Sequence, residues 1–146
     1  MIDLVHKEII QKVIDLLKVD SNLLENSIIK KYYFGVPLKF LDYPSIWVQL
    51  NERRETGRNA LNQVLYDYVI EVGVIDRAIN EDDAEKSVYD KLELVEAILD
   101  DNPTLAGLVD DIKPAKGIEI IHASESDYAI SIGRLLFSAR KVLDHD

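Results

Sequence analysis

The sequence predicts an α+β fold. We expect a single domain over residues 1–146, with a mostly antiparallel, twisted sheet of four or five strands and two helices on one of its faces. Apolar residues recur at helical spacing near the N-terminus and again after residue 80, whereas apolar and polar residues alternate in the remaining ordered stretches. A length of 146 residues with 47% apolar content suits one domain with one sizeable core.

The composition argues against nucleic acid and membranes as binding partners. The net charge is −10, from 27 acidic against 17 basic residues, whereas a nucleic-acid-binding surface needs Lys and Arg to neutralise phosphates. We therefore expect no specific nucleic-acid binding, and solubility by like-charge repulsion. No apolar run could span a bilayer and no signal peptide is visible, so we expect no membrane association. Cysteine is absent, which excludes disulfides and thiolate metal sites.

The N-terminal part predicts a helix followed by a short strand. Residues 3–18 form the helix, with Asp3 as N-cap and an apolar face broader than one stripe. That breadth suits burial within the domain, or partly against a neighbouring subunit. Residues 23–27 suit one helical turn, and the β-branched and aromatic residues 28–34 predict a short or edge strand before Gly35.

A strand and a polar stretch come next. Residues 45–50 predict the strand, because Ile46, Val48 and Leu50 alternate with their neighbours. Residues 51–62 are the most polar stretch of the chain, and no two-residue hairpin signal closes it. We therefore expect a long flexible hairpin loop between Leu50 and Val64, which is either functional or simply solvated.

The strand over residues 64–75 organises the domain. Its even-numbered residues from Val64 to Val74 are apolar or aromatic and predict the core face, whereas its mixed odd-numbered residues predict a partly wet face. Twelve residues correspond to about 40 Å, longer than a usual strand. Such a strand is expected to extend past its own core and to offer a surface to a partner.

Asn80 predicts the N-cap of a second amphipathic helix, because three acidic residues follow it and favour the positive end of the helix dipole. Pro103 disfavours helical geometry before it, so the helix should end by Asn102. The expected core positions of this helix are Ala84, Val88, Leu92, Val95, Ile98 and Leu99.

The C-terminal part predicts two further strands. Residues 105–112 are extended or loop, residues 114–117 interrupt them, residues 118–123 form a strand, residues 124–127 a turn, and residues 128–143 the last strand. In this strand the apolar residues change from even to odd positions after Gly133. Either a one-residue bulge near Gly133–Arg134 explains the change, or the strand passes from one environment into another, such as a subunit interface.

No polar cluster predicts catalytic chemistry. The histidines have no second ligand at metal-binding spacing; they are His6, His122 and His145. The acidic pairs at 100–101 and 110–111 suit helix ends and turns, and neither a phosphate-binding glycine motif nor a nucleophile elbow is present. We expect no enzymatic activity, no cofactor and no metal. Four tyrosines suit a core or an interface better than a base-stacking platform, because no basic stripe surrounds them. They are Tyr32, Tyr33, Tyr66 and Tyr68.

The order of elements and one turn resemble the tail-completion proteins of tailed viruses, also called tail terminators or head–tail joining proteins. The shared features are a leading helix, a proline-introduced strand at Tyr43–Leu50, a strand of alternating aromatic residues and valines, and a following helix. That helix ends in the Asn-Pro-Thr-Leu-small-Gly turn Asn102–Gly107. The resemblance covers nearly the whole chain.

The resemblance implies a structural role in a virion. Members of the family form a ring, usually sixfold, that caps the finished tail tube and meets the head connector while DNA passes through its lumen. For this chain it implies a homo-oligomer in the virion tail or neck, assembled in the host cytoplasm, with the tail tube protein and a head connector or neck protein as partners. An acidic lumen would not hold passing phosphates.

The polar stretch 51–62 is then the candidate interface with another subunit or with the tube, because its mixed charges suit pairing across a heterologous ring interface. The candidate residues are Glu52, Arg53, Arg54, Glu55 and Arg58. The alternatives are another neck or adaptor protein, the cap of a contractile injection device or, from a different class, a small metabolic or ligand-binding α+β domain. The last predicts a monomer or dimer with a concave polar pocket.

Overall fold

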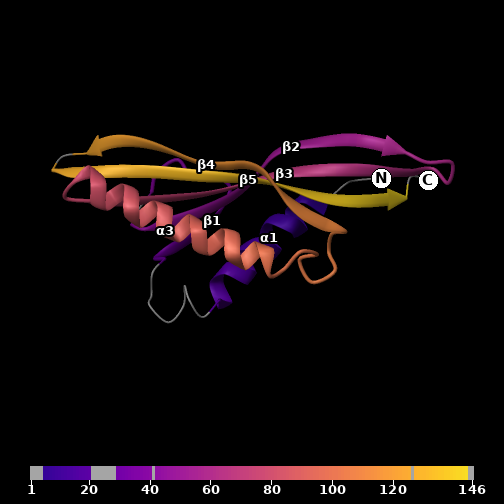
Figure 1. The fold of residues 1–146 in the computed structure, drawn as a ribbon, viewed down its shortest axis with the longest axis horizontal. Helices are drawn as coiled ribbons and strands as arrows, with labels where there is room; N and C mark the ends of the chain where they lie inside the picture. The colour runs from indigo at the N-terminus through magenta and orange to yellow at the C-terminus, as the bar shows by residue number, and fades with distance from the viewer. Residues whose placement is uncertain (1–4, 21–28, 41, 126, 145–146) are drawn as a thin grey trace.

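A computed structural model describes residues 5–20, 29–40, 42–125 and 127–144 (Figure 1). In chain order the elements are α1 (Val5–Val19), β1 (Lys31–Phe34), β2 (Ser45–Arg58), β3 (Gln63–Ala78), α3 (Glu81–Asp100), β4 (Asp111–Glu125) and β5 (Tyr128–Asp144). The predicted N-cap Asp3 and the helical turn at 23–27 lie outside the described residues. No helix within the described ranges is long and apolar enough to cross a membrane.

The strands form one five-stranded sheet in the order β1-β2-β3-β5-β4. β1 is parallel to β2, and every other neighbouring pair is antiparallel. The domain is therefore α+β with a mixed, mostly antiparallel sheet, and the five-strand alternative is confirmed. β3 lies at the centre and pairs with β5 without interruption from Gln63↔Asp144 to Ala78↔Ala129.

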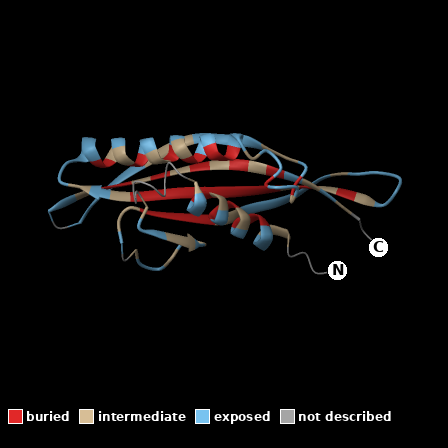
Figure 2. Cartoon of the chain, turned by 90° about the horizontal axis from the view of Figure 1, so that it is seen from below, coloured by how far each residue is buried: buried red, intermediate tan, exposed pale blue. Residues whose placement is uncertain are grey.

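Both helices pack on one face of this sheet, where they meet the even-numbered residues of β3. Figure 2 shows the buried stripe of α3 along the side that faces the sheet. Asn80 caps α3 as predicted, since its Oδ1 accepts a hydrogen bond from the Asp83 backbone N–H at 2.8 Å. The six predicted core positions of α3 are all buried. The broad apolar face of α1 is buried within the domain through Ile9, Ile10, Val13, Ile14 and Leu17.

Gly133 of β5 lets α3 approach the sheet closely. A Cβ at this position would lie 2.5 Å from Val88 Cγ1 and 2.6 Å from Leu92 Cδ1. Because real Cβ atoms do not approach other carbons so closely, any side chain at Gly133 would push the helix away.

The last strand contains no bulge, so the bulge expected near Gly133–Arg134 is wrong and the alternative of two environments holds. After Gly133 the odd-numbered residues Leu135 and Phe137 belong to the core under the helices. Before it, Ile130 joins a second apolar cluster with Trp47 and Ile75, and Ile132 packs against that cluster. Since side chains alternate across a strand, this second cluster lies on the helix-free face of the sheet.

The predicted partly wet face of β3 is also wrong along most of its length. Val69, Glu71, Gly73 and Ile75 are all buried, although they point away from the helices. The indole of Trp47 lies against Gly73, and Phe40 and Tyr43 from the segment before β2 pack onto the same cluster. The middle of β3 is therefore buried on both faces, and Glu71 is the one charged side chain among these four buried positions of its helix-free face.

The edge strands differ from expectation in length. β1 occupies only part of the predicted 28–34 segment and is an edge strand, as expected. β4 runs through the predicted interruption at 114–117, so the separate strand at 118–123 is part of a longer one. Its register shifts between Pro114 and Lys116 and again between Lys116 and Glu119. Pro114 is accommodated because edge strands and bulges tolerate a missing backbone N–H.

Candidate functional site

The stretch 51–62 joins two antiparallel strands, as the predicted hairpin requires, but the expectation that most of it is a long flexible loop is wrong. β2 continues to Arg58 and β3 begins at Gln63, so only residues 59–62 form the turn. The Asn59 side chain holds this turn: its Oδ1 accepts from the N–H groups of Leu61 and Gln63, and its Nδ2 donates to Gln63 Oε1. Asn62 adopts a left-handed conformation with φ 61°, which asparagine tolerates. We refer to residues 51–67 as the hairpin arm.

The arm projects beyond the helices at one end of the molecule, where β2 and β3 run to the right in Figure 1. Most of its residues are exposed, as the pale-blue end in Figure 2 shows. β5 flanks β3 from Gln63 to Asp67, so the arm is supported by a third paired strand.

The five candidate residues divide between the two faces of the arm. Register shifts in β2 occur between Leu50 and Glu52 and between Glu55 and Gly57. After the first shift, Glu52 and Arg54 pair with odd-numbered residues of β3, whereas Arg53, Glu55 and Arg58 pair with even-numbered ones. The structure therefore places two of the candidates on the helix-free face and three on the opposite face.

Each face of the arm holds an exposed ion pair. Arg54 Nε lies 2.8 Å from Glu52 Oε1, and Arg58 Nε lies 2.7 Å from Glu55 Oε1. The Arg53 guanidinium lies over the Tyr66 ring, 4.8 Å from its centroid. Solvent-exposed pairs contribute little to stability, about 0–1 kcal/mol each. Their charge pattern can nevertheless orient a partner, because complementary charges across an interface select register.

A buried carboxylate network, missed by sequence reasoning, ties four strands together on the helix-free face. Glu71 is 3% exposed. Its Oε2 accepts from Trp47 Nε1 at 2.9 Å and Gln49 Nε2 at 2.5 Å, and its Oε1 accepts from Arg134 Nη1 at 2.8 Å. Arg134 also donates from Nε to Glu119 Oε2 at 3.1 Å, which brings in β4.

Burial alone would raise the pKa of Glu71, but the hydrogen bonds from Trp47, Arg134 and Gln49 outweigh it and hold the pKa below its ordinary value. The group is therefore a satisfied anion at neutral pH. Its role is structural: the carboxylate accepts hydrogen bonds from the surrounding side chains and so links the strands that carry them. Its partners lie 22 to 63 residues away along the chain, so no local sequence pattern predicts this network.

The turn that ends α3 has an unusual backbone. Leu105, Ala106 and Gly107 all have positive φ, at 48°, 60° and 88°. Leu105 is fully buried and anchors the turn in the core, and the Thr104 carbonyl accepts from both Gly107 and Val109. Asn102 Nδ2 donates to the Ile98 carbonyl at 2.8 Å and closes the end of the helix. Two non-glycine residues in the left-handed region mark a strained turn that the surrounding packing holds.

The other predicted polar features do not converge on a catalytic or metal centre. Within the described ranges, no three side chains of the metal-ligating types form a group that could hold a metal ion. His122 Nδ1 lies 3.0 Å from Ser131 Oγ, and Asp110 Oδ2 accepts from the Val142 backbone N–H at 3.0 Å. His145 lies outside the described residues. Tyr66 and Tyr68 are buried in the core, which agrees with the preferred interpretation of these aromatic residues.

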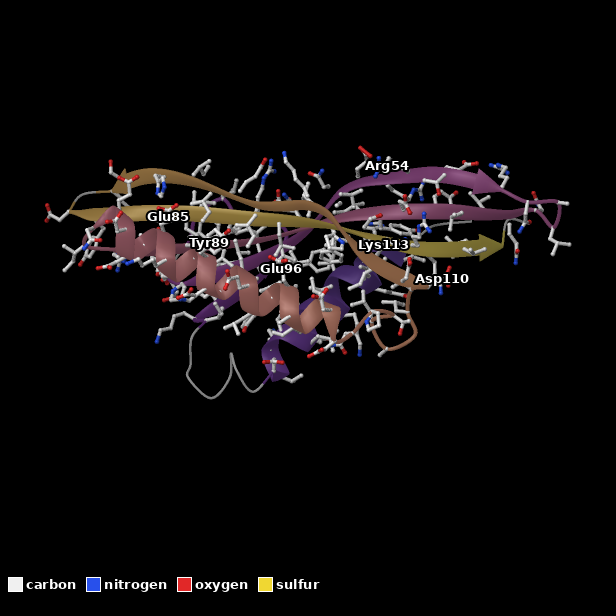
Figure 3. All side chains as sticks on the ribbon, in the orientation of Figure 1. Arg54, Glu85, Tyr89, Glu96, Asp110 and Lys113 are labelled. Atoms are coloured by element: carbon white, nitrogen blue, oxygen red, sulfur yellow. The ribbon has the colours of Figure 1, made fainter. Side chains whose placement is uncertain are left out.

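A groove lies between the C-terminal half of α3 and the irregular part of β4. Its apolar lining includes Leu99, Ile112, Pro114, Leu135 and Phe137. Its polar rim is divided by sign, with carboxylates from α3 and amines from β4. These rim residues are Glu96, Asp100, Lys113 and Lys116. Figure 3 labels Glu96 on α3 and Lys113 at the start of β4.

Comparisons with known proteins find similarity in structure and none in sequence. No protein-family model matches the chain, and no curated protein sequence matches it. The fold is similar to that of a chain in a solved structure described as the virion of a native gene transfer agent particle. That similarity has a TM-score of 0.56 at 14% sequence identity, and it covers 90% of this chain and 92% of the other. The likeness shows that the two chains share a fold.

Proposed function

We propose that this chain is a non-enzymatic structural protein of a virion, which closes the tail tube as a ring and joins it to the head connector. The observation that carries the proposal is the fold shared, over 90% of this chain and 92% of the other, with a chain of a gene transfer agent virion. A match over nearly both full lengths favours a similar role for the whole domain over a shared fragment.

The structure supports an assembly role in two ways. The hairpin arm is a paired, folded projection whose exposed surface is mostly polar, with Leu61 exposed at its turn, which suits a contact made after folding. The ordered strands also leave β4 as a long exposed edge beside a groove with charges of both signs on its rim. In this proposal the subunits form a homo-oligomer, sixfold in the family that the sequence resembles, and its partners are the tail tube protein and a head connector or neck protein.

The test is to measure the mass of the purified chain under native conditions and to image it by negative stain, alone and after mixing with assembled tail tubes. We expect rings with a defined subunit number in solution, or discs at tube ends that stop tube elongation. A chain that remains monomeric, leaves tube ends bare and binds a metabolite would overturn the proposal in favour of a ligand-binding domain.

The arm has its own test within this proposal. Reversing the three arm arginines to glutamate, at Arg53, Arg54 and Arg58, should leave the circular dichroism spectrum unchanged and reduce the assembled fraction. A matched variant with the same change in net charge reverses exposed lysines elsewhere, at Lys7, Lys30 and Lys39. Normal assembly of the arm variant, or equal loss in both variants, would show that the arm makes no specific contact.

A further inference from the structure

The turn of the hairpin arm presents an apolar side chain to solvent on a rigid support. Leu61 is 79% exposed, and the Asn59 side chain fixes the backbone on both sides of it. Arg58 lies one residue before this turn, at the end of β2. A single exposed leucine is ordinary on a protein surface. Here, however, the arm projects, its turn is fixed and an arginine is adjacent. This combination suits a side chain that inserts into a groove of a partner.

The α3–β4 groove described above has complementary properties. Its volume is about 60 Å³, several times the roughly 10–15 Å³ that a single water needs. Its lining is largely aliphatic and aromatic, and Glu96 and Asp100 stand on its helical rim. Lys113 and Lys116 stand on its strand rim. An occupant that fits therefore brings an apolar side chain, with positive charge on the side of α3 and negative charge on the side of β4.

The outer face of α3 strengthens the charge argument. The helix contains eight acidic residues and two lysines, a net charge of −6 out of −10 for the whole chain. The stretch 51–62 carries charges of both signs, three arginines and two glutamates with a net charge of +1, so Arg58 can face the acidic helix while Glu55 faces the lysines of β4. Complementary charges of this kind steer association and fix orientation.

The arm of one molecule cannot fill the groove of the same molecule. Phe137 lines the groove, whereas Asp144 pairs with Gln63 beside the turn of the arm. Seven residues of the continuous strand β5 separate these two positions, which corresponds to about 23 Å. The arm also points away from α3, as Figure 1 shows. An arm that fills the groove must therefore belong to another molecule.

We propose that the hairpin arm of one copy docks on the α3–β4 groove of the next copy, with Leu61 in the groove and Arg58 against Glu96 and Asp100. Donor and acceptor are different surfaces of the same chain, so the contact is heterologous and propagates from copy to copy into a closed ring or an open helix. This inference rests on the proposed ring function and adds the contact that joins neighbouring subunits.

Disulfide trapping tests this contact, because the native sequence has no cysteine. The variant Leu61→Cys/Glu96→Cys, oxidised under conditions in which rings form alone or on tubes, should give a ladder of covalent oligomers on a non-reducing gel. Each single-cysteine variant should stop at a dimer. The matched control is Leu61→Cys/Lys86→Cys, since Lys86 is exposed on the same helix about 15 Å from Glu96 along its axis and does not line the groove.

A charge exchange gives a second readout. Reversing Arg58 to Glu, or both Glu96 and Asp100 to Lys, should each reduce the assembled fraction by about tenfold, since two interface ion pairs together contribute on that order. Combining the two changes in one chain should restore assembly to within about threefold of the native level. Unchanged emission from Trp47 would confirm that each variant is folded.

The outcomes separate the docking mode from the function. Rings that form without the covalent ladder, or with an equal ladder in the Lys86 control, would overturn the docking mode and leave the ring proposal intact. A native chain that forms no ring, either alone or on tubes, would overturn the ring function itself.

Discussion

Gly73 is the position at which one added methyl group should disturb the helix-free face most. A Cβ built there would lie 1.9 Å from Trp47 Cζ2 and 2.0 Å from Trp47 Cε2. Carbon atoms that are not bonded approach to about 3.5–4.0 Å, so in Gly73→Ala the indole must move by at least about 1.5 Å.

The expected loss in the free energy of unfolding follows from the packing and the hydrogen bond that this movement of the indole disturbs. Trp47 is 5% exposed, and its ring centroid lies 5.6 Å from that of Phe40, so the indole has little room to shift. Overpacking of this kind costs about 1–3 kcal/mol. The shift would also stretch the 2.9 Å bond from Trp47 Nε1 to the Glu71 carboxylate beyond hydrogen-bonding range, which adds about 1.5–3 kcal/mol. We therefore expect Gly73→Ala to lower the free energy of unfolding by about 2.5–6 kcal/mol.

The assay is urea denaturation followed by tryptophan fluorescence, which reports on this site because Trp47 is the only tryptophan of the chain. Gly57→Ala is the matched control: an added Cβ there meets nothing within 4 Å, so its effect should stay within about 0.5 kcal/mol. In a Trp47→Ala background, Gly73→Ala should cost much less, since the clashing ring is gone. A native-like midpoint and unchanged emission for Gly73→Ala would refute the placement of the indole over Gly73.

Two further predictions concern Glu71 and Asn80. The folded-state pKa of Glu71 is lowered, so its stabilising contribution is complete above the unfolded pKa of about 4.3 and is lost as the pH falls through the folded value. Glu71→Gln should lower the free energy of unfolding by about 1.5–3 kcal/mol at pH 7. In urea titrations this difference from the native chain should shrink below about pH 4. An equal difference at pH 7 and pH 3 would contradict the assignment of Glu71 as a stabilising anion. Asn80→Ala should lower the free energy of unfolding by about 1 kcal/mol through loss of the cap, measured by circular dichroism, whereas the exposed Glu93→Ala should change it by less than about 0.5 kcal/mol; equal effects would exclude a capping role.

The second helix and the core face of β3 could be predicted because their sequence signals are local. The second helix follows from features within a few residues of each other: the Asn80 cap, the acidic first turn, and an apolar repeat that ends before Pro103. The core face of β3 follows equally well, because strict alternation from Val64 to Val74 admits only one buried face under the helices.

The hairpin arm could not be predicted because alternation fails there. The register shift between Leu50 and Glu52 changes the face on which each later residue of β2 lies, and those residues are polar on both faces. A polar strand outside the core and a polar loop are indistinguishable in sequence. The five candidate residues all lie on the hairpin arm, but their division between its two faces depends on pairing with β3, which no pattern within residues 51–62 indicates.

The last strand shows a different limit. A change of apolar residues from even to odd positions at Gly133 has two explanations that a sequence cannot separate. The structure decides between them because Ile130 and Leu135 lie in different clusters on opposite faces of an unbroken strand. The second cluster exists only because Trp47 and the segment before β2 cover the helix-free face, and that covering depends on contacts distant in sequence.

The difference between a loop and a folded arm also changes how assembly should depend on the arm. A flexible loop would have to be ordered on binding, at about 1–2 kcal/mol per residue for the backbone alone. The arm is already paired with β5, and the Asn59 side chain already holds its turn, so little ordering remains to oppose docking. Charge changes on the arm should therefore act on association and leave folding largely unaffected, because its ion pairs are exposed and contribute little to the stability of the subunit. A long central strand thus has two separate roles: its middle, buried on both faces, stabilises the domain, and its end supports a surface that can evolve for a partner without destabilising the core.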